Sequence, residues 1–217
     1  MIRTTLSCIL LVVASAALLT GCGRKASDEI DFGTLKNSVY QNNYFGLTVT
    51  FPTDWSVQDQ ESQRQIMAAG RAVVAGNDKN LTAAIKQASE LQTVNLFAVF
   101  KFAMGSPVPF NPAILGVAER VRQLPGIQRG KDYLFHAREL LKSSQLQATF
   151  PKEFYTARLG GVDFDVMDSE IAIRGMMVKE KYYAAIRKGY ALAFVVSYQT
   201  DEQEALQRKV LDTITLN

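Results

Sequence analysis

Both cysteines of this chain, Cys8 and Cys22, lie at its N-terminus, inside and just after its only long apolar run. The run, Leu6 to Leu19, has 14 residues, whereas a transmembrane helix needs about 20. With Arg3 ahead of it, this layout is typical of a cleaved export signal. Cleavage after residue 21 leaves 196 residues without a pair of cysteines, so the exported part must be stabilised by its hydrophobic core alone.

The cleavage site is marked by the sequence LTGC at residues 19–22. It resembles the lipobox of bacterial lipoproteins, in which a leucine and two small residues precede the cysteine. In that class diacylglycerol alkylates the cysteine thiol, the signal is cut before it and its amine is acylated, so the resemblance implies that Cys22 is lipidated. Two or three acyl chains hold a protein on a membrane stably, whereas one holds it only marginally. An ordinary secretory signal, with Cys22 near the cut by chance, is the alternative.

A lipid on Cys22 implies a protein of the cell envelope whose first partner is the membrane. Gly23 stands where aspartate would imply inner-membrane retention, so the same resemblance implies the outer membrane, facing the periplasm, in a cell with two membranes. Residues 23–37 are small, polar and charged, which predicts a flexible tether of about 20 Å. The expected organisation is a signal peptide (1–21), a lipidated cysteine with its tether (22–37) and a single domain (38–217).

The charge balance argues against a nucleic-acid partner. The formal net charge of +3 becomes +2 without Arg3, the only charged residue of the signal. Basic pairs such as Arg24-Lys25 and Arg187-Lys188 are scattered, whereas nucleic-acid-binding proteins gather their basic residues on one face. We therefore expect no nucleic acid among the partners.

The domain opens with a half-buried strand, LTVTF at 47–51, in which apolar residues alternate with threonine before Pro52. The sequence around this strand resembles the start of PsbP-like domains, which occur in photosystem-associated proteins and in many bacterial lipoproteins. The segments that carry the resemblance at the two ends of the domain are YQNNYFGL (40–47), PTDW (52–55), LGGVDF (159–164), 182–198 and 201–216.

The resemblance implies an α+β fold in which an antiparallel β-sheet is covered by helices, a PsbP-like sandwich. It also implies a non-catalytic role, because relatives of that fold dock onto larger complexes. We therefore expect a protein partner in the cell envelope and no enzymatic activity.

Residue patterns alone are consistent with an antiparallel sheet beside helices. The predicted helices are 62–75, 81–91, 131–143 and a last helix that follows a capping box of Thr200 and Gln203. The predicted strands are 94–101 and the hairpin 178–187 with 190–199, while 114–121 suits a strand or a helix. Side chains predicted to face inward are Ile66, Met67, Val73, Val74, Tyr133, Ala137, Leu140, Leu141, Leu206, Val210 and Ile214.

Aromatic residues gather around the strand 94–101, its proline-marked loop 105–112 and the hairpin. They are Phe97, Phe100, Phe102, Phe110, Tyr182, Tyr183, Tyr190 and Tyr198. Opposite faces of one strand cannot enter one core, so some of these side chains must line helix contacts, an apolar cleft or a partner surface. Helix contacts are the expectation, because both faces of the sheet are expected to be covered.

His136, the only histidine, lies in the middle of the predicted helix 131–143. A catalytic histidine needs a nucleophile or an orienting acid near it, and zinc usually needs several histidine or cysteine ligands. Because the exported chain keeps no free thiol, we expect a structural or surface role for His136.

The acidic segment DFDVMDSE, 163–170, offers a second candidate. On a strand Asp163 and Asp165 share a face, where two carboxylates could bind Ca²⁺. The spacing departs from the EF-hand loop, so a solvent-exposed strand face that runs into a turn is the favoured interpretation.

GIQRGKD, 126–132, faintly resembles a phosphate-binding loop, but it has three residues between its glycines and an aspartate after the lysine. It is interpreted as the turn before a helix. Neither G-x-S-x-G nor H-E-x-x-H occurs. We therefore predict no catalytic, cofactor-binding or metal-binding residue, and Cys22 as the one modified site.

Three functions remain open. The first is a non-catalytic, membrane-anchored binding or assembly module. The second is a carrier of a lipid or other apolar ligand in a cleft between sheet and helices, which an enclosed cavity lined by the aromatic residues would favour. The third is a hydrolase, which a pocket holding His136 within hydrogen-bond reach of a serine or aspartate would favour.

Cys22→Ser tests the lipid anchor. Serine cannot form the thioether, so the variant should lose lipid labelling and leave the membrane fraction or stay uncleaved. Labelling with an acyl-chain precursor and detergent partitioning measure both effects. A processed Cys22→Ser protein that partitions like the unchanged chain would contradict the lipoprotein interpretation.

Overall fold

The computed structural model describes residues 31–79, 82, 93–173 and 175–217, which belong to the compact unit Asp31–Asn217. Cys22 and, apart from Thr82, the predicted helix 81–91 lie outside the described residues. The expected fold class is confirmed, because antiparallel sheets are covered by helices.

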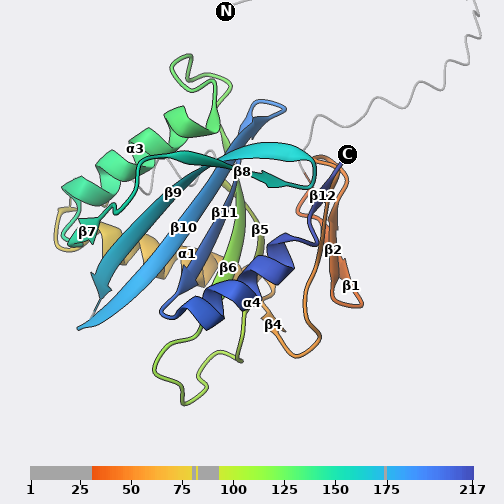
Figure 1. Cartoon of the computed structure of the whole chain (residues 1–217), viewed down its shortest axis with the longest axis horizontal. Coiled ribbons are helices and arrows are strands. Elements are labelled where there is room, and N and C mark those ends of the chain that lie inside the picture. Colours follow the sequence, from red (N-terminus) through yellow and green to blue (C-terminus); the bar gives the residue numbers. More distant parts are fainter. Residues whose placement is uncertain (1–30, 80–81, 83–92, 174) are drawn as a thin grey trace, which may run out of the picture. The chain divides into compact units, whose positions relative to one another are not determined.

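The larger sheet has the strand order β4-β5-β6-β11-β10-β9-β7, with β8 paired to β9, and every neighbouring pair is antiparallel (Figure 1). Its strands are β4 (Ser56–Val57), β5 (Thr93–Phe100), β6 (Ala113–Arg120), β7 (Ala148–Thr149), β8 (Tyr155–Leu159), β9 (Val162–Ile173), β10 (Met176–Arg187) and β11 (Tyr190–Tyr198). The ambiguous segment 114–121 is thus a strand, because its backbone pairs with β5 on one side and β11 on the other.

The smaller sheet joins the two ends of the described chain. Its order is β1-β2-β3-β12, with β1 (Thr34–Lys36), β2 (Val39–Asn42), β3 (Leu47–Thr50) and β12 (Thr215–Leu216). The predicted alternating strand is confirmed, since Leu47 and Val49 are buried and Thr50 is exposed. β1 lies within 22–37, the stretch interpreted as a tether, so the folded unit begins before residue 38.

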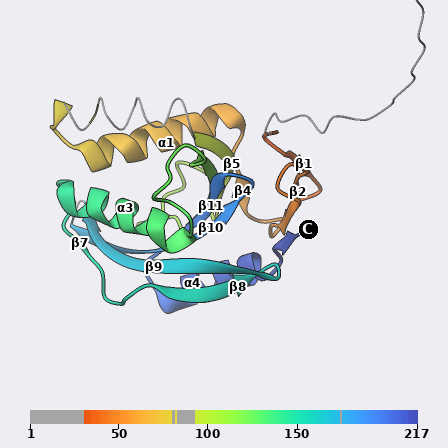
Figure 2. The ribbon, with the colours of Figure 1, turned by 90° about the horizontal axis from the view of Figure 1, so that it is seen from above.

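Helices cover both faces of the larger sheet. Helix α1 (Gln60–Ala75) and helix α3 (Gly130–Ser143) lie on one side of β9 and β10, and helix α4 (Asp201–Leu211) lies on the other (Figure 2). Met67 and Val74 of α1 and Leu134 and Leu141 of α3 contact one apolar cluster. Both faces of the central strands are therefore buried, which explains why β11 reads as a continuous apolar run.

The two faces of β11 differ in side-chain size. Ala193 faces the cluster under α3, whereas Phe194 faces the other way and stacks on Phe97 with ring centroids 6.0 Å apart. Phe97 in turn contacts Tyr40 of the smaller sheet at 5.2 Å. A Cβ atom on Gly116 would lie 2.5 Å from the Phe97 ring, so glycine is required beneath this aromatic layer. Phe97 therefore belongs to a core of aromatic rings between strands, whereas contacts with helices were expected for it.

The predicted hairpin between β10 and β11 is confirmed. Lys188 and Gly189 have φ angles of +50° and +81°, the conformation of a two-residue turn that matches the twist of the strands. Arg187 and Tyr190 pair directly across it.

Three side chains predicted to face inward are exposed instead: Val73, Leu140 and Leu206. On α4 the fully buried position is Gln207, next to the exposed Leu206. The Gln207 Nε2 donates hydrogen bonds to the carbonyl oxygens of Ala113 and Ser197, both at 2.9 Å. These two bonds hold the amide nitrogen in the core, whereas the Gln207 Oε1 finds no partner among the described residues. Val210 and Ile214 are buried as predicted, so in this part of the chain the apolar spacing was wrong only for Leu206.

Trp55→Ala tests the packing of the buried indole that follows β3. Trp55 is 8% exposed, so its removal should leave a cavity and lower the free energy of unfolding by about 3 to 5 kcal/mol. Urea denaturation followed by circular dichroism measures the change. A loss below about 1 kcal/mol would show that the indole is a surface contact.

Candidate binding site on helix α3

The N-terminus of α3 rests directly on the sheet. A Cβ atom on Gly130 would lie 1.9 Å from the carbonyl oxygen of Ala184 in β10, so only glycine permits this approach. The backbone N–H of Lys131 donates to Asp165 Oδ2 of β9 at 2.8 Å. The segment GIQRGKD is therefore a turn and a helix start, as interpreted. The Asp165 carboxylate binds the N-terminal end of the helix, the position at which a phosphate-binding loop would bind its phosphate.

A second carboxylate orders the turn before α3. Asp132 Oδ2 accepts hydrogen bonds from the backbone N–H groups of Gln128 and Arg129 at 3.1 and 2.9 Å. These bonds hold the pKa of Asp132 below its ordinary value. The loop that leads from β6 to α3 is thereby fixed at the helix end.

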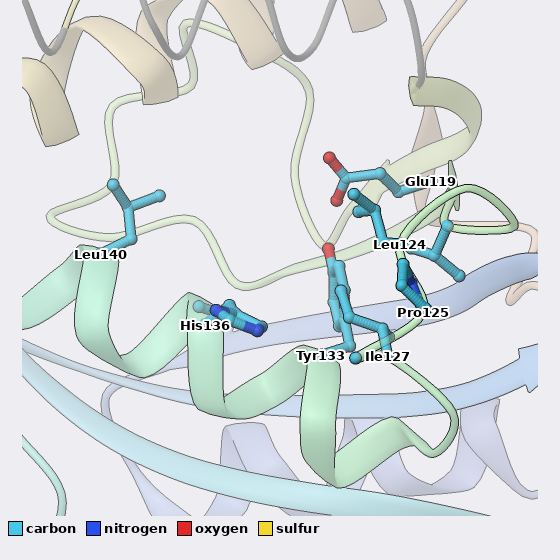
Figure 3. A pocket seen from close by; sticks show the side chains of 10 residues that line it. Glu119, Leu124, Pro125, Ile127, Tyr133, His136 and Leu140 are labelled. Carbon is cyan, nitrogen blue, oxygen red and sulfur yellow. The ribbon is translucent and has the colours of Figure 1, made fainter.

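A cavity of about 540 Å³ lies between this loop and the outward face of α3 (Figure 3). Most of its wall is apolar: Val121, Leu124, Pro125, Ile127, Ala137 and Leu140. Leu124 and Leu140 are 42% and 36% exposed, so large apolar side chains at the site remain accessible to solvent. The polar side chains of the wall are Glu119, Tyr133 and His136.

Glu119 and Tyr133 face each other inside the cavity. The Tyr133 hydroxyl points toward the Glu119 carboxylate (Figure 3). Burial raises the pKa of the Tyr133 phenol well above its ordinary value, and the neighbouring Glu119 raises it further. The phenol is therefore a proton donor at neutral pH, and the carboxylate is its acceptor.

His136 lines the cavity and packs against an aromatic neighbour. Its ring contacts Phe135 edge-on at a centroid distance of 5.7 Å. No serine, cysteine, threonine or aspartate belongs to the described wall of this cavity. Asp132 lines a neighbouring hollow together with His136, but its carboxylate accepts from the backbone N–H groups of Gln128 and Arg129.

A second hollow, of about 370 Å³, flanks α3 on its other side. It is lined by Gly126, Lys131, Asp132, Phe135, His136, Arg138, Glu153 and Phe154. Gly126 and His136 line both hollows, so the two meet at these residues. A Cβ atom on Gly126 would meet no atom within 4 Å, so the space beside this residue is unfilled.

The sheet also carries a half-buried carboxylate on β10. Glu180 of β10 accepts hydrogen bonds from the hydroxyls of Tyr182 and of Ser197, the latter at 3.0 Å. Burial raises the pKa of Glu180, and these two hydrogen bonds oppose the rise. Glu180 belongs to the packing between sheet and helix and does not line either hollow.

The acidic segment 163–170 is divided between the two faces of β9. Asp163 pairs with Arg158 at 3.2 Å, and Asp165 holds α3 as described. Asp168 is buried on the opposite face, where it accepts from the Tyr155 hydroxyl at 2.9 Å and pairs with Lys181 at 3.7 Å. The interpretation as a solvent-exposed strand face is therefore wrong for Asp165 and Asp168, because a helix N-terminus and a lysine engage them. In the described residues no group of three or more histidine, cysteine, aspartate or glutamate side chains is arranged to bind a metal.

Sequence reasoning missed one wall of the cavity. Leu124, Pro125 and Ile127 were not singled out, although three apolar residues in a short proline- and glycine-containing loop are a usable signal of a binding surface. His136 and Leu140 were named for other reasons, and only the position of α3 against the loop brings them into the site.

Comparison with known proteins finds no matching family model and no matching curated protein. Among solved structures the chain is similar to the cyanobacterial PsbP of Synechocystis sp. PCC 6803, with a TM-score of 0.48 and 9% identity over 82% of this chain and 91% of that one. It is also similar to LpqN, involved in cell envelope biogenesis of Mycobacterium tuberculosis (TM-score 0.42, 16% identity, 78% and 83% covered). A third is PA94 of Pseudomonas aeruginosa, a protein of unknown function described as a putative regulator (0.40, 15%, 52% and 78%).

A PsbP is thus among the similar structures, as the resemblance of the two chain ends predicted. These likenesses concern the fold and say nothing of a ligand. None of the helices described here is both long and apolar enough to cross a membrane.

Asp165→Ala tests what holds α3 in place. Loss of the bond to the Lys131 N–H should lower the free energy of unfolding by about 1 kcal/mol, the usual effect of removing a helix cap. Asp163→Ala is the matched control, because Asp163 lies on the same face but forms only a surface ion pair, and its loss should stay within about 0.5 kcal/mol. Equal losses for the two variants in urea denaturation would contradict the assignment.

Proposed function

We propose that this chain is a non-catalytic binding module of the cell envelope, anchored through a lipid on Cys22, and that it binds an apolar ligand in the cavity beside α3. The observation that carries the proposal is the cavity itself. Its volume of about 540 Å³ lies within the range of ~300–1000 Å³ that is usual for small-molecule sites. A largely apolar wall with a few converging polar groups is the common composition of such sites.

Exposed leucines at the site support binding rather than a purely structural role. Leu124 and Leu140 come from different elements, yet both line the same cavity. Because each leucine is already more than half buried, covering its exposed part is worth about 1 kcal/mol. A ligand that fills the cavity would obtain this stabilisation, which water cannot supply.

No serine, cysteine or threonine lines the described wall beside His136, which fits a non-catalytic role. The expected lipid anchor gives such a module a permanent place at a membrane, where apolar ligands and envelope proteins are found. Of the three functions that the sequence left open, the proposal is thus closest to the carrier of an apolar ligand.

Docking of a protein partner is the second candidate, and the loop between β5 and β6 favours it. Phe102 and Met104 are exposed in this loop. Asn111 fixes its base, since its side chain exchanges hydrogen bonds with the backbone of Phe102 at 2.9 and 2.8 Å. A rigid loop that presents apolar side chains is suited to a protein contact in the envelope.

Fluorescence of N-phenyl-1-naphthylamine, an uncharged apolar probe, tests the carrier proposal on the full chain carrying Cys22→Ser, so that no attached acyl chain competes. The unchanged cavity should bind the probe and raise its emission. Leu140→Gln should weaken binding by about 5- to 20-fold, because a polar group replaces part of the apolar wall.

Leu206→Gln is the matched control. Leu206 is also a solvent-exposed leucine on a helix, at 43%, but α4 covers the opposite face of the sheet. Probe binding should be unchanged in this variant. Equal weakening by both substitutions, or no binding by the parent chain, would refute the proposed site.

A further inference from the structure

The two hollows beside α3 have opposite characters. The larger has a mainly aliphatic wall and one charged side chain, Glu119. The smaller is lined by two cations, two carboxylates and two aromatic rings. Both are lined by His136 and Gly126, so the two hollows are adjacent.

The two cations of the smaller hollow are only weakly paired with its two carboxylates. Of its two carboxylates, Asp132 is engaged by the turn before α3 and by Arg129, with which it forms an ion pair at 3.5 Å. Glu153 is 93% exposed and lies 4.0 Å from Arg138, at the limit of an ion pair. Solvent screening makes such a pair weak. Lys131 and Arg138 therefore remain available to an anion.

Both cations are held over one aromatic ring. Arg138 lies 4.4 Å and Lys131 5.9 Å from the centroid of Phe154. The Arg138 side chain is only 18% exposed, and its Nε finds no hydrogen-bond partner among the described residues. A planar guanidinium fixed in this way is pre-organised to donate to a carboxylate or a similar oxyanion.

Glu119 gives the ligand a direction. Its carboxylate stands in the apolar hollow, where it already faces the Tyr133 hydroxyl. An anionic head group would be repelled there, whereas an alkyl chain would contact the aliphatic wall. The charges of the two hollows thus separate the two ends of an amphiphile.

We propose that the two hollows together bind a single-chain amphiphile with an anionic head, of the fatty-acid class. Its alkyl tail lies along Leu124, Ala137 and Leu140, it passes His136 and Gly126, and its carboxylate is held by Lys131 and Arg138. The inference rests on the proposed function, since it assigns a ligand class to the same cavity.

Three ligands with the same tail and different heads test the inference: dodecanoate, dodecanol and dodecyltrimethylammonium. Each is used below its micelle-forming concentration to displace N-phenyl-1-naphthylamine from the full chain carrying Cys22→Ser. Dodecanoate should displace the probe at an about tenfold lower concentration than the other two, because only its head pairs with the cations. Higher salt should reduce this preference, since exposed charges are screened.

Two variants locate the head group. Lys131→Gln and Arg138→Gln should each reduce the preference for dodecanoate by about three- to tenfold and leave displacement by dodecanol unchanged. Lys209→Gln, which removes an exposed cation from α4 on the opposite face of the sheet, is the control and should change nothing. Circular dichroism checks that each variant is folded, and the exposed Lys131 provides the test if Arg138→Gln is not.

The outcomes separate this inference from the proposed function. If the three ligands displace the probe at equal concentrations, the anionic assignment is wrong while the apolar site stands. The same holds if dodecyltrimethylammonium displaces the probe at the lowest concentration, which would mean that Glu119 binds its head group. If neither the probe nor any of the ligands binds, both proposals fall. Loss of the dodecanoate preference in Lys209→Gln as well would reduce it to a general charge effect and overturn the assignment.

Discussion

The contact between the first turn of α3 and the strands beneath it governs the rest of the site. Gly130 lets the helix backbone approach the carbonyl of Ala184, and Asp165 accepts the N–H of the next residue. Together they fix the position and the direction of the helix on β9 and β10. The cavity depends on this contact, because one of its walls is the outward face of α3 and the other is the loop that ends at the same turn.

The sheet accommodates this helix because its two faces carry side chains of different size. Alanines such as Ala184 and Ala193 lie under α3 and allow close approach, while Phe97, Phe164 and Phe194 fill the space on the other face. The aromatic face is covered by the smaller sheet and α4. Small side chains on the alanine face let α3 lie close to the sheet. The helix buries Leu134 and Leu141 there, while Leu140 is exposed to solvent.

Several elements could be predicted because local patterns are strong there. The capping box at Thr200, the turn at Lys188 and the alternation after Leu47 all depend on residues close in sequence. Helix faces were predicted less well, since an apolar stripe does not say which neighbour it meets. Gln207 is buried because two strand carbonyls accept from it, and these strands lie 94 and 10 residues away. No local pattern carries that information.

The sequence by itself determined the local elements, the class of fold and the absence of a recognisable catalytic motif, because each follows from residue types at short spacing. It also supplied the expectation of a lipid on Cys22. Only the tertiary structure decided what these elements form together. Asp165 became a helix cap instead of a solvent-exposed carboxylate, and Leu124, His136 and Leu140 became walls of one cavity. The reason is physical: a cavity and a long-range cap require groups far apart in the chain to meet, and sheet pairing and side-chain packing determine which groups those are.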